Sequence, residues 1–495
     1  MCALAHFLQS GTSRNLLIAP LIALVVLLAP GQSAGALPNL GQDAATIISP
    51  YEERRVGEGA MMQIRQQLDF VDDPELAYYI KRLGNRLTGA LVDKQRDYQF
   101  FLIESPVINA FALPGGFIGF HTGLITNAAS ESELASVMAH EIAHVSQRHW
   151  PRQVAAQKDR SGLTMAAILA SLVLAAAGDV NAGGVAAAAL AADADSQLAF
   201  TRSFEREADR IGIRLLSDAK YDSRAMADFF ERLDAANRFG GGANIPEFMR
   251  THPVTTNRIA EARDNAAQLP RNSRTSSSDF YHFRARTRAY YQPDPRQALA
   301  HFARELKQEN IPTTERQAAR YGLALVHLRL GNYDIADKNI AILRKQNNSE
   351  LRYRLAQADI AIAAGRTKRG LEFYRQIYAD RSTNAWVARR YGESLLNQQR
   401  PKHALRVLQS ALKQTPKDPV LNRLIAKAAG ETGDLVRAHR AMAEYHLING
   451  NPYEAINQLG IAAKKAQKDY YALTAIRARI VEIENSGKKN MVEHQ

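Results

Sequence analysis

The chain is almost devoid of cysteine. Cys2 is the only cysteine in 495 residues, and it lies before the first apolar run of the sequence. Cleavage after that run would leave a mature protein with no cysteine, so disulfide bonds cannot stabilise it and thiol catalysis is excluded. The position of Cys2 ahead of the apolar run also rules it out as a lipid-attachment site.

Long apolar runs are scarce as well. Residues 16–28 and 163–177 are nearly all apolar or small, but both runs are shorter than the roughly 20 residues that cross a bilayer as a helix. The first run is followed by Ala34-Gly35-Ala36, which has the small-x-small form of a signal-peptide cleavage site. We therefore expect a signal peptide over residues 1–36, cleaved near Ala36, and a mature protein in the periplasm. An uncleaved membrane anchor is the alternative, and the shortness of the run disfavours it.

Acidic residues are fewer than basic ones, and the net charge is +13. This balance is compatible with nucleic acid, anionic lipid or acidic protein as a partner, but export argues against nucleic acid. A group of lysines makes the C-terminal half locally basic, which favours acidic partners such as anionic lipid or lipopolysaccharide and a peripheral membrane contact. These lysines are Lys413, Lys417, Lys427, Lys464, Lys465 and Lys468.

A His-Glu-x-x-His motif occupies residues 140–144. Residues four apart lie on one face of a helix, so His140 and His144 can bind the same metal ion, and zinc is the ion this spacing indicates. Glu141 follows the first of these histidines, where it can act as general base on a water molecule beside the metal. Ser130 and Glu133 have the spacing of a capping box, which predicts that the helix begins there.

The segments before this helix predict two helices within residues 51–95 and then three strands, at 98–103, 109–113 and 117–120. Pro114-Gly115-Gly116 predicts a tight turn between the last two strands. Because this hairpin leads directly into the histidine helix, we expect one strand to form the rim of a substrate cleft, where its free edge can bind an extended peptide. A hairpin that only builds the core is the alternative. The proposed edge residues are Asn109, Ala110, Phe111 and Ala112.

These motifs, in this order, resemble the zinc metallopeptidase family of HtpX and the CAAX prenyl proteases. The resemblance is carried by Asn-Ala-Phe-Ala-Leu-Pro-Gly-Gly at 109–116, by Thr-Gly-Leu at 122–124 and by the motif at 140–144, and it covers about residues 50–270. HtpX and the prenyl proteases span the membrane several times, whereas this chain resembles the family's exported periplasmic branch. A membrane-embedded prenyl-type protease would require the alanine-rich insert at 163–192 to span a bilayer. We expect that insert to form a buried helix or a flap over the cleft.

A catalytic zinc site normally has three protein ligands and one water. Glu205 and Asp209 share one helix face at four-residue spacing, beside an apolar face. The family's Glu-x-x-Ala-Asp pattern maps onto them, which implies that Glu205 ligates zinc and that Asp209 accepts a hydrogen bond from a ligand histidine. Glu207 is a rival on pattern alone, but it lies about 200° round the helix from Glu205.

Two further histidines need an interpretation. His149 follows His144 by five residues, so on a continuous helix it points elsewhere, and we expect it at the surface. His252, in Thr251-His252-Pro253, matches a Thr-His-Pro segment that the resemblance places just after the zinc core. It could stabilise the oxyanion, ligate zinc in place of water and hold the enzyme closed, or be purely structural, and the sequence leaves all three roles open.

Beyond a polar linker at 269–279 the sequence repeats. Gly331, Gly365, Gln399 and Gly433 are spaced at the 34-residue period of tetratricopeptide repeats. Four such repeats would form a superhelix with a groove for a partner segment. Gly450 continues the pattern at half a period and indicates a truncated or capping unit.

These observations predict a mainly α zincin-type domain with a small β-sheet (α+β), followed by an all-α repeat superhelix. The expected divisions are a signal peptide at 1–36, the peptidase domain at 37–268, a linker with leading helices at 269–310, and the repeats at 311–495. The resemblance to the repeat-containing periplasmic branch implies one Zn²⁺ per chain and unfolded or misfolded protein substrates. It also implies quality control and assembly of outer-membrane β-barrel proteins, with chaperone activity and with the assembly machinery bound in the repeat groove. The rival hypothesis is a non-catalytic repeat chaperone or scaffold whose metal site is accessory or autoinhibited.

Overall fold

The computed structural model describes residues 48–92, 96–156, 194–239, 246–272 and 274–492. The predicted signal peptide and the insert at 163–192 lie outside the described residues. Within those ranges, no helix combines the length and the apolar character needed to span a bilayer.

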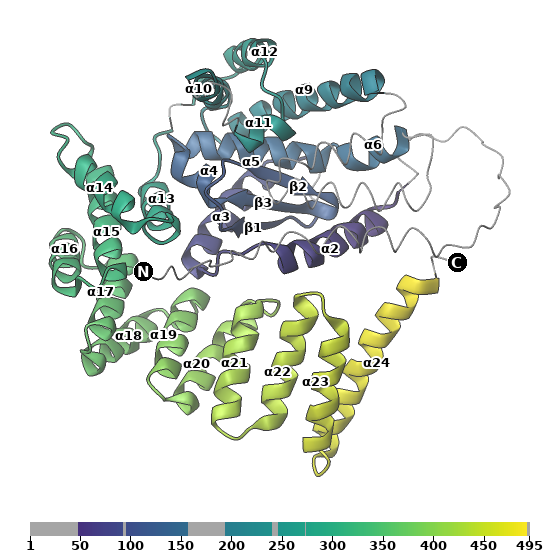
Figure 1. Cartoon of the computed structure of the whole chain (residues 1–495), viewed down its shortest axis with the longest axis vertical. Helices are drawn as coiled ribbons and strands as arrows, with labels where there is room; N and C mark the ends of the chain where they lie inside the picture. The colour runs from purple at the N-terminus through teal and green to yellow at the C-terminus, as the bar shows by residue number, and fades with distance from the viewer. Residues whose placement is uncertain (1–47, 93–95, 157–193, 240–245, 273, 493–495) are drawn as a thin grey trace, which may run out of the picture. The chain divides into compact units, whose positions relative to one another are not determined.

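The N-terminal part begins with two helices and a three-stranded sheet (Figure 1). The two predicted helices are confirmed, and the sheet has the order β1-β3-β2, with β1 parallel and β2 antiparallel to β3. Strand β2 therefore lies at an edge of the sheet. The elements are α2 (Pro50–Gln67), α3 (Pro74–Thr88), β1 (Gln99–Ile103), β2 (Ala110–Leu113) and β3 (Phe117–His121).

The turn between β2 and β3 depends on glycine. Pro114–Gly116 forms a single 3-10 turn in which Gly115 has φ 74° and Gly116 has φ 90°. A Cβ on Gly115 would lie 2.6 Å from the Cα of Arg54 on α2. The turn thus holds the hairpin close against α2, and a side chain there would push the two apart.

Helix α5 is the central element of this part, and its residues from Glu131 to Ala143 are all buried. Ser130 caps it by accepting a hydrogen bond from the backbone N–H of Glu133 at 3.1 Å. The carboxylate of Glu133 accepts from the N–H of Ala129 at 2.8 Å, one residue before the position that a capping box predicts. Besides α2 and α3, the helices of this part within the described residues are α4 (Thr122–Asn127), α5 (Glu131–Ser146), α6 (His149–Ala156), α9 (Ala194–Asp218), α10 (Ala225–Phe239), α11 (Glu247–Thr251) and α12 (Thr256–Ala267).

The predicted 34-residue period appears directly in the helices. Helices α16, α18, α20 and α22 begin at Tyr333, Thr367, Pro401 and Leu435, and each follows a turn residue with positive φ. Gln399 adopts φ 55° in the place that glycine holds in the other turns, so the period persists where the residue type changes. The helices are α13 (Ser278–Tyr291), α14 (Pro295–Leu306), α15 (Thr313–Arg329), α16 (Tyr333–Gln346), α17 (Leu351–Ala363), α18 (Thr367–Asp380), α19 (Ala385–Asn397), α20 (Pro401–Gln414), α21 (Pro419–Glu431), α22 (Leu435–Ile448), α23 (Pro452–Lys465) and α24 (Tyr470–Val492).

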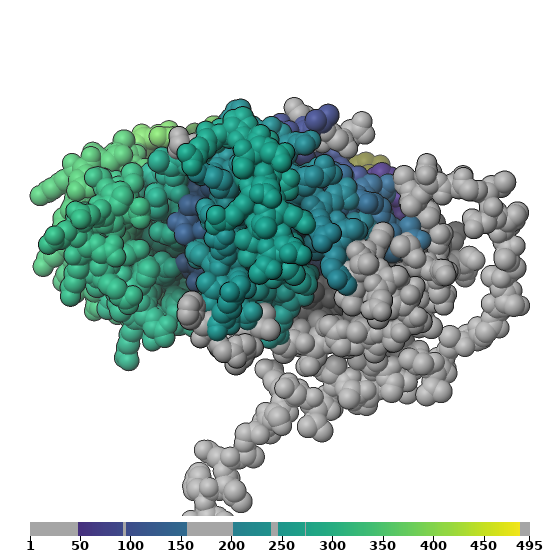
Figure 2. All heavy atoms as spheres, turned by 90° about the horizontal axis from the view of Figure 1, so that it is seen from above, coloured from purple at the N-terminus to yellow at the C-terminus, as the bar shows by residue number. Residues whose placement is uncertain are grey.

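Helix α13 joins the two parts of the chain. Phe280 and Phe283 belong to the hydrophobic core of the N-terminal part, whereas Ala285 and Ala289 belong to the core of the first repeats. In the view from above, teal residues of α10 to α13 form much of the visible face beside the green helices of the first repeats (Figure 2). The predicted fold class, mainly α with a small sheet and followed by helical repeats, is confirmed.

A buried histidine on α13 predicts a pH dependence of stability. His282 lies 2.7 Å from the carbonyl oxygen of Ser278 through Nδ1 and 2.8 Å from the hydroxyl of Tyr353 through Nε2. Burial, reinforced by Arg352, lowers the pKa of His282 to about 4. Between about pH 6.5 and pH 4, His282 therefore binds a proton in the unfolded chain but not in the folded chain. Its contribution to stability is fully present above pH 6.5 and is lost as the pH falls toward 4.

We expect this histidine to contribute about 3 kcal/mol of that loss, because one pKa unit corresponds to about 1.4 kcal/mol. The measurement compares the unfolding free energy of the wild-type chain and of His282→Asn at several pH values between 4 and 7. The asparagine variant should show the smaller slope. Equal slopes would contradict the assignment.

Candidate metal centre and substrate cleft

Helix α5 presents two histidines on one face, as the spacing predicts. The Nε2 atoms of His140 and His144 lie 3.0 Å apart. Helix α9 packs closely against this region, because a Cβ on Gly212 would lie 3.2 Å from the backbone nitrogen of His140. Small residues at this crossing bring the acidic face of α9 within reach of the histidines.

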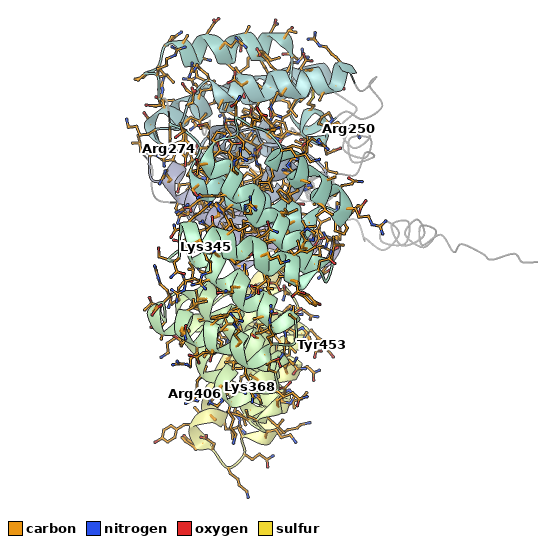
Figure 3. All side chains as sticks on the ribbon, turned by 90° about the vertical axis from the view of Figure 1, so that its left-hand side faces the viewer. Arg250, Arg274, Lys345, Lys368, Arg406 and Tyr453 are labelled. Carbon is orange, nitrogen blue, oxygen red and sulfur yellow. The ribbon has the colours of Figure 1, made fainter. Side chains whose placement is uncertain are left out.

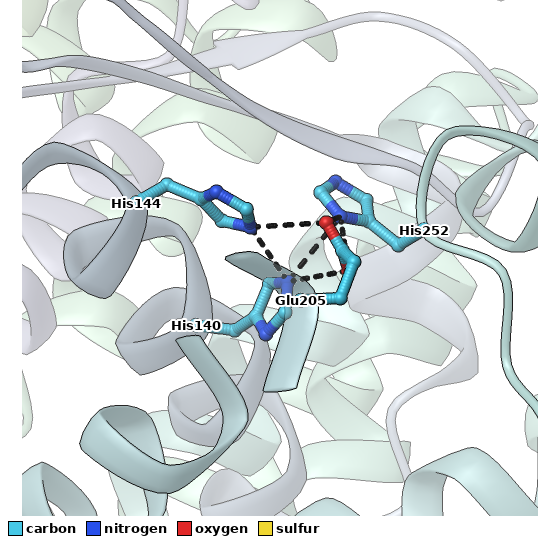
Figure 4. A group of neighbouring side chains, drawn as sticks. All are labelled: His140, His144, Glu205 and His252. Carbon is cyan, nitrogen blue, oxygen red and sulfur yellow. Dashed lines mark hydrogen bonds and ion pairs between the residues drawn. The ribbon is translucent and has the colours of Figure 1, made fainter. Parts of the chain in front are cut away.

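Two more side chains complete a four-residue cluster (Figure 4). The Glu205 carboxylate lies 3.4 Å from the Nε2 atoms of both His140 and His144. Nδ1 of His252 lies 3.0 Å from Glu205 Oε2 and 3.3 Å from Nε2 of His140. One potential ligand atom from each of the four residues lies within 4.8 Å of the others, so these residues can hold a metal ion.

Behind the cluster, Asp209 is paired on both sides. Its Oδ1 lies 3.0 Å from Nδ1 of His140, which is the contact expected for a residue that orients a ligand histidine. Arg258 donates to both Asp209 oxygens at 2.8 Å and lies 3.1 Å from Glu205. No motif in the sequence marks Arg258, which the fold of α12 brings to this site.

Glu141 is almost fully buried, with 1% of its surface exposed. It accepts a hydrogen bond from the backbone N–H of Ala112 on the edge strand, and Nε2 of His252 lies 3.5 Å from its Oε1. Burial raises the pKa of Glu141, and the neighbouring histidines only partly oppose that shift. The carboxylate is thus placed between the cluster and the edge strand.

The two histidines of the motif have opposite pKa shifts, and the Glu205 carboxylate beside them is held ionised. Burial opposes the protonation of His140, but hydrogen bonds to Asp209 and Glu205 outweigh it and raise its pKa to about 10. Burial lowers the pKa of His144 to about 4. Burial alone would raise the pKa of Glu205, but the surrounding histidines hold that pKa well below its ordinary value. Three imidazoles and one carboxylate within reach of one another form a donor set that fits a zinc-type ion.

The surface position expected for His149 is wrong. Helix α5 ends at Ser146, and Arg148 adopts φ 54°, so α6 starts in a new direction instead of continuing the first helix. His149 is consequently 4% exposed, and its Nδ1 lies 2.9 Å from Nδ1 of His144.

A cleft of about 250 Å³ opens beside the cluster. Phe111, Ala112 and Leu113 of the edge strand line it, so three consecutive residues of β2 border the cleft, whereas the predicted edge residues Asn109 and Ala110 are fully buried and do not line it. The lining also includes the side chains of Glu141, His144, Glu205 and His252.

Comparison with known proteins relates both parts of the chain to described families. The model of peptidase family M48 matches residues 74–266, and a tetratricopeptide repeat model matches residues 361–428. The putative β-barrel assembly-enhancing protease of Vibrio cholerae serotype O1 is 34% identical over 447 residues, which cover 90% of this chain and 91% of that protein. The β-barrel assembly-enhancing protease of Escherichia coli strain K12 is 31% identical over 455 residues, which cover 91% and 92%.

A eukaryotic relative matches a shorter region. The mitochondrial metalloendopeptidase OMA1 of Schizosaccharomyces pombe is 31% identical over 206 residues, which cover 41% of this chain and 56% of that protein. Similarity to the bacterial proteins therefore extends over most of both chains, and similarity to the mitochondrial protein does not.

Proposed function

Because the chain belongs to peptidase family M48 and is a metallopeptidase, we propose that it is a zinc-dependent endopeptidase of the periplasm. In this proposal it acts in the quality control and assembly of outer-membrane β-barrel proteins. The observation that carries the proposal is the convergence of His140, His144 and Glu205 beside a cleft bordered by an edge strand. The names of the bacterial relatives, which align along most of the chain, support the β-barrel part.

His140, His144 and Glu205 are the three protein ligands in this proposal, and Asp209 orients His140 through its Nδ1. When bound, zinc supplies Lewis acidity, which makes water a better nucleophile at neutral pH and polarises the scissile carbonyl. Arg258 neutralises Asp209 and keeps it in place through two hydrogen bonds. The cluster is then held by α5 on one side and by α9 and α12 on the other.

Glu141 is the general base and then the general acid. Its carboxylate takes a proton from the attacking water and delivers it to the amine of the leaving peptide. The edge of β2 holds the substrate in an extended conformation through the backbone groups that Glu141 does not occupy, and such hydrogen bonds demand little of the substrate's side chains. An unfolded polypeptide meets that requirement, whereas a folded domain does not.

Metal removal tests the catalytic part of the proposal. We expect a strong chelator to reduce cleavage of an unfolded β-barrel protein to background and one equivalent of zinc to restore it. Zinc should also stabilise the fold, by about 4 kcal/mol at a thousandfold excess over its dissociation constant. The Glu205→Gln chain should bind zinc weakly. Full cleavage by a chain shown to be metal-free would overturn the assignment.

His252 is proposed to be a fourth ligand that keeps the site closed, because its Nδ1 lies among the atoms that would surround the metal. We expect His252→Ala to raise the peptidase rate about tenfold, which corresponds to about 1.4 kcal/mol of preference for the closed state. The exposed His403 on α20 offers a matched control, and His403→Ala should leave the rate unchanged. A lower rate in His252→Ala would support the oxyanion role instead, and an unchanged rate would leave His252 structural.

The location and partners are further parts of the proposal. Residues 1–36 have the pattern of a cleaved signal peptide, and the lysines of the C-terminal half are exposed, as are Lys345, Lys368 and Arg406 (Figure 3). Exposed basic side chains on the repeats are compatible with a peripheral contact to anionic lipid. Crosslinkers placed in the repeat region 311–480 of a Glu141→Gln chain should capture unfolded β-barrel proteins and their assembly machinery. Capture of neither would overturn the proposed partners.

The rival function is a repeat chaperone with a silent metal site. The same contact of His252 with the cluster supports it, because a fourth ligand would block the metal. A deletion strain that carries the Glu141→Gln chain separates the two functions. If this chain rescued every defect, proteolysis would not be the main function. If it rescued none, the chaperone hypothesis would fail.

A further inference from the structure

His149 forms a second layer behind one of the proposed ligands. It is the first residue of α6, and the break at Arg148 turns its ring back toward α5. Its Nδ1 lies 2.9 Å from Nδ1 of His144, with the two rings nearly perpendicular at 84°. The other nitrogen of His144 faces the cluster, 3.0 Å from Nε2 of His140.

The geometry determines where the hydrogen atoms lie. Two ring nitrogens 2.9 Å apart share one hydrogen, so one donates and the other accepts. Nε2 of His144 must offer a lone pair to a metal, so its hydrogen is on Nδ1 and His149 accepts it. The hydrogen of His149 is then on Nε2, which lies 3.4 Å from Oε2 of Glu207.

Glu207 and the ring of His149 are themselves held in place. Arg152 donates to Oε2 of Glu207 at 2.9 Å, and its guanidinium lies 4.6 Å from the centre of the Phe204 ring. The His149 ring stacks on Phe204 at 4.4 Å with an interplanar angle of 14°. Phe204 directly precedes Glu205. The ring that supports His149, and through it the proposed ligand His144, therefore belongs to the residue next to another proposed ligand.

We propose that Glu207 and His149 form a relay that fixes the tautomer and orientation of His144 as a metal ligand. The two ligand histidines thus receive different support, since Asp209 contacts His140 directly and Glu207 reaches His144 through a second imidazole. His149 and Glu207 are positioning residues that touch no reacting atom. The inference rests on the proposed zinc site.

The test measures zinc affinity on the purified full chain, by competition with a chromophoric chelator. His149→Phe keeps the stacking on Phe204 and removes the acceptor, whereas His149→Asn restores an acceptor near the position of Nδ1. Glu207→Gln weakens the far end of the relay. Arg206→Gln is the matched control on α9, because Arg206 is exposed and pairs with Glu261 away from the cluster.

We expect His149→Phe to weaken zinc binding by about 10- to 100-fold, as outer-shell partners of ligand histidines typically do. His149→Asn should recover most of the affinity, Glu207→Gln should show a smaller loss, and Arg206→Gln none. The visible absorption spectrum of bound Co²⁺ should differ from the wild-type spectrum in His149→Phe and match it in His149→Asn. The metal-free forms of these two variants should unfold at similar temperatures.

Two results would overturn the relay. Wild-type zinc affinity in His149→Phe would show that His144 needs no partner, and equal loss in the phenylalanine and asparagine variants would show that restoring an acceptor does not restore the affinity. In both cases tight zinc binding by the wild-type chain would leave the proposed peptidase function standing. Failure of the wild-type chain to bind zinc would overturn that function and the relay together.

Discussion

The Glu141→Gln chain is expected to lose peptidase activity by a factor of about 10³ while it keeps its fold and its metal. General acid–base groups contribute typically about 10² to 10⁴ in rate, and Glu141 is proposed to act both as base and as acid in one turnover. Glutamine has the same size and can still accept the hydrogen bond from Ala112, but it cannot take a proton. The loss should therefore appear in kcat, with little change in substrate binding.

Three measurements make this expectation specific. Zinc content and the unfolding midpoint of Glu141→Gln should match the wild-type chain, because the carboxylate is not one of the proposed ligands. Glu393→Gln, at an exposed position on α19, should keep full activity. If Glu141→Gln retained more than about a tenth of the wild-type rate with its metal in place, another group would have to move the proton.

The parts of this protein that the sequence predicts well are those set by short-range periodicity. The four-residue spacing of His140 and His144 places both on one face of α5, and the 34-residue period marks the start of every second helix from α16 to α22. Gln399 shows that the period carries more information than the residue type, since its backbone adopts the positive φ of the glycine turns. Local geometry alone accounts for these predictions.

The contacts that the sequence did not reveal arise from tertiary structure. Arg258 binds Asp209 across 49 residues of chain, and no local pattern marks an arginine for that contact. The expected surface position of His149 assumes a continuous helix, whereas α5 ends at Ser146 and Arg148 adopts a positive φ, with its guanidinium 3.2 Å from Glu53. The periodicity of α5 does not show where that helix ends, whereas Pro151, which lacks the N–H that a continuous helix would bond to residue 147, is the local signal for a break.

Buried charged side chains connect the repeats to the peptidase domain. The second large expected effect comes from replacing one of them, Arg286. Arg286 on α13 is 5% exposed, and its Nε lies 2.7 Å from Asp73, which caps α3. The same atom lies 3.6 Å from Glu75, and Nη1 donates to the Tyr321 hydroxyl at 3.1 Å. Burial raises the pKa of Glu75, and Arg286 is the main group that opposes the shift.

We expect Arg286→Met to lower the unfolding free energy by about 3 to 5 kcal/mol, because it removes the cation and leaves Asp73 and Glu75 buried with weaker compensation. Denaturant unfolding measures the loss. Arg296→Met, at an exposed site on α14, should change stability by less than about 0.5 kcal/mol.

The double variant Arg286→Met with Glu75→Gln separates charge from packing. The glutamine removes one of the carboxylates left unpaired, so the double variant should be more stable than Arg286→Met alone, although Glu75→Gln alone should be destabilising. Additive losses would instead mean that the two side chains act independently and that packing sets the cost. A change of less than about 1 kcal/mol in Arg286→Met would show that Arg352 and Arg390, which lie 3.2 Å and 3.7 Å from the Glu75 carboxylate, are sufficient to balance the buried acid.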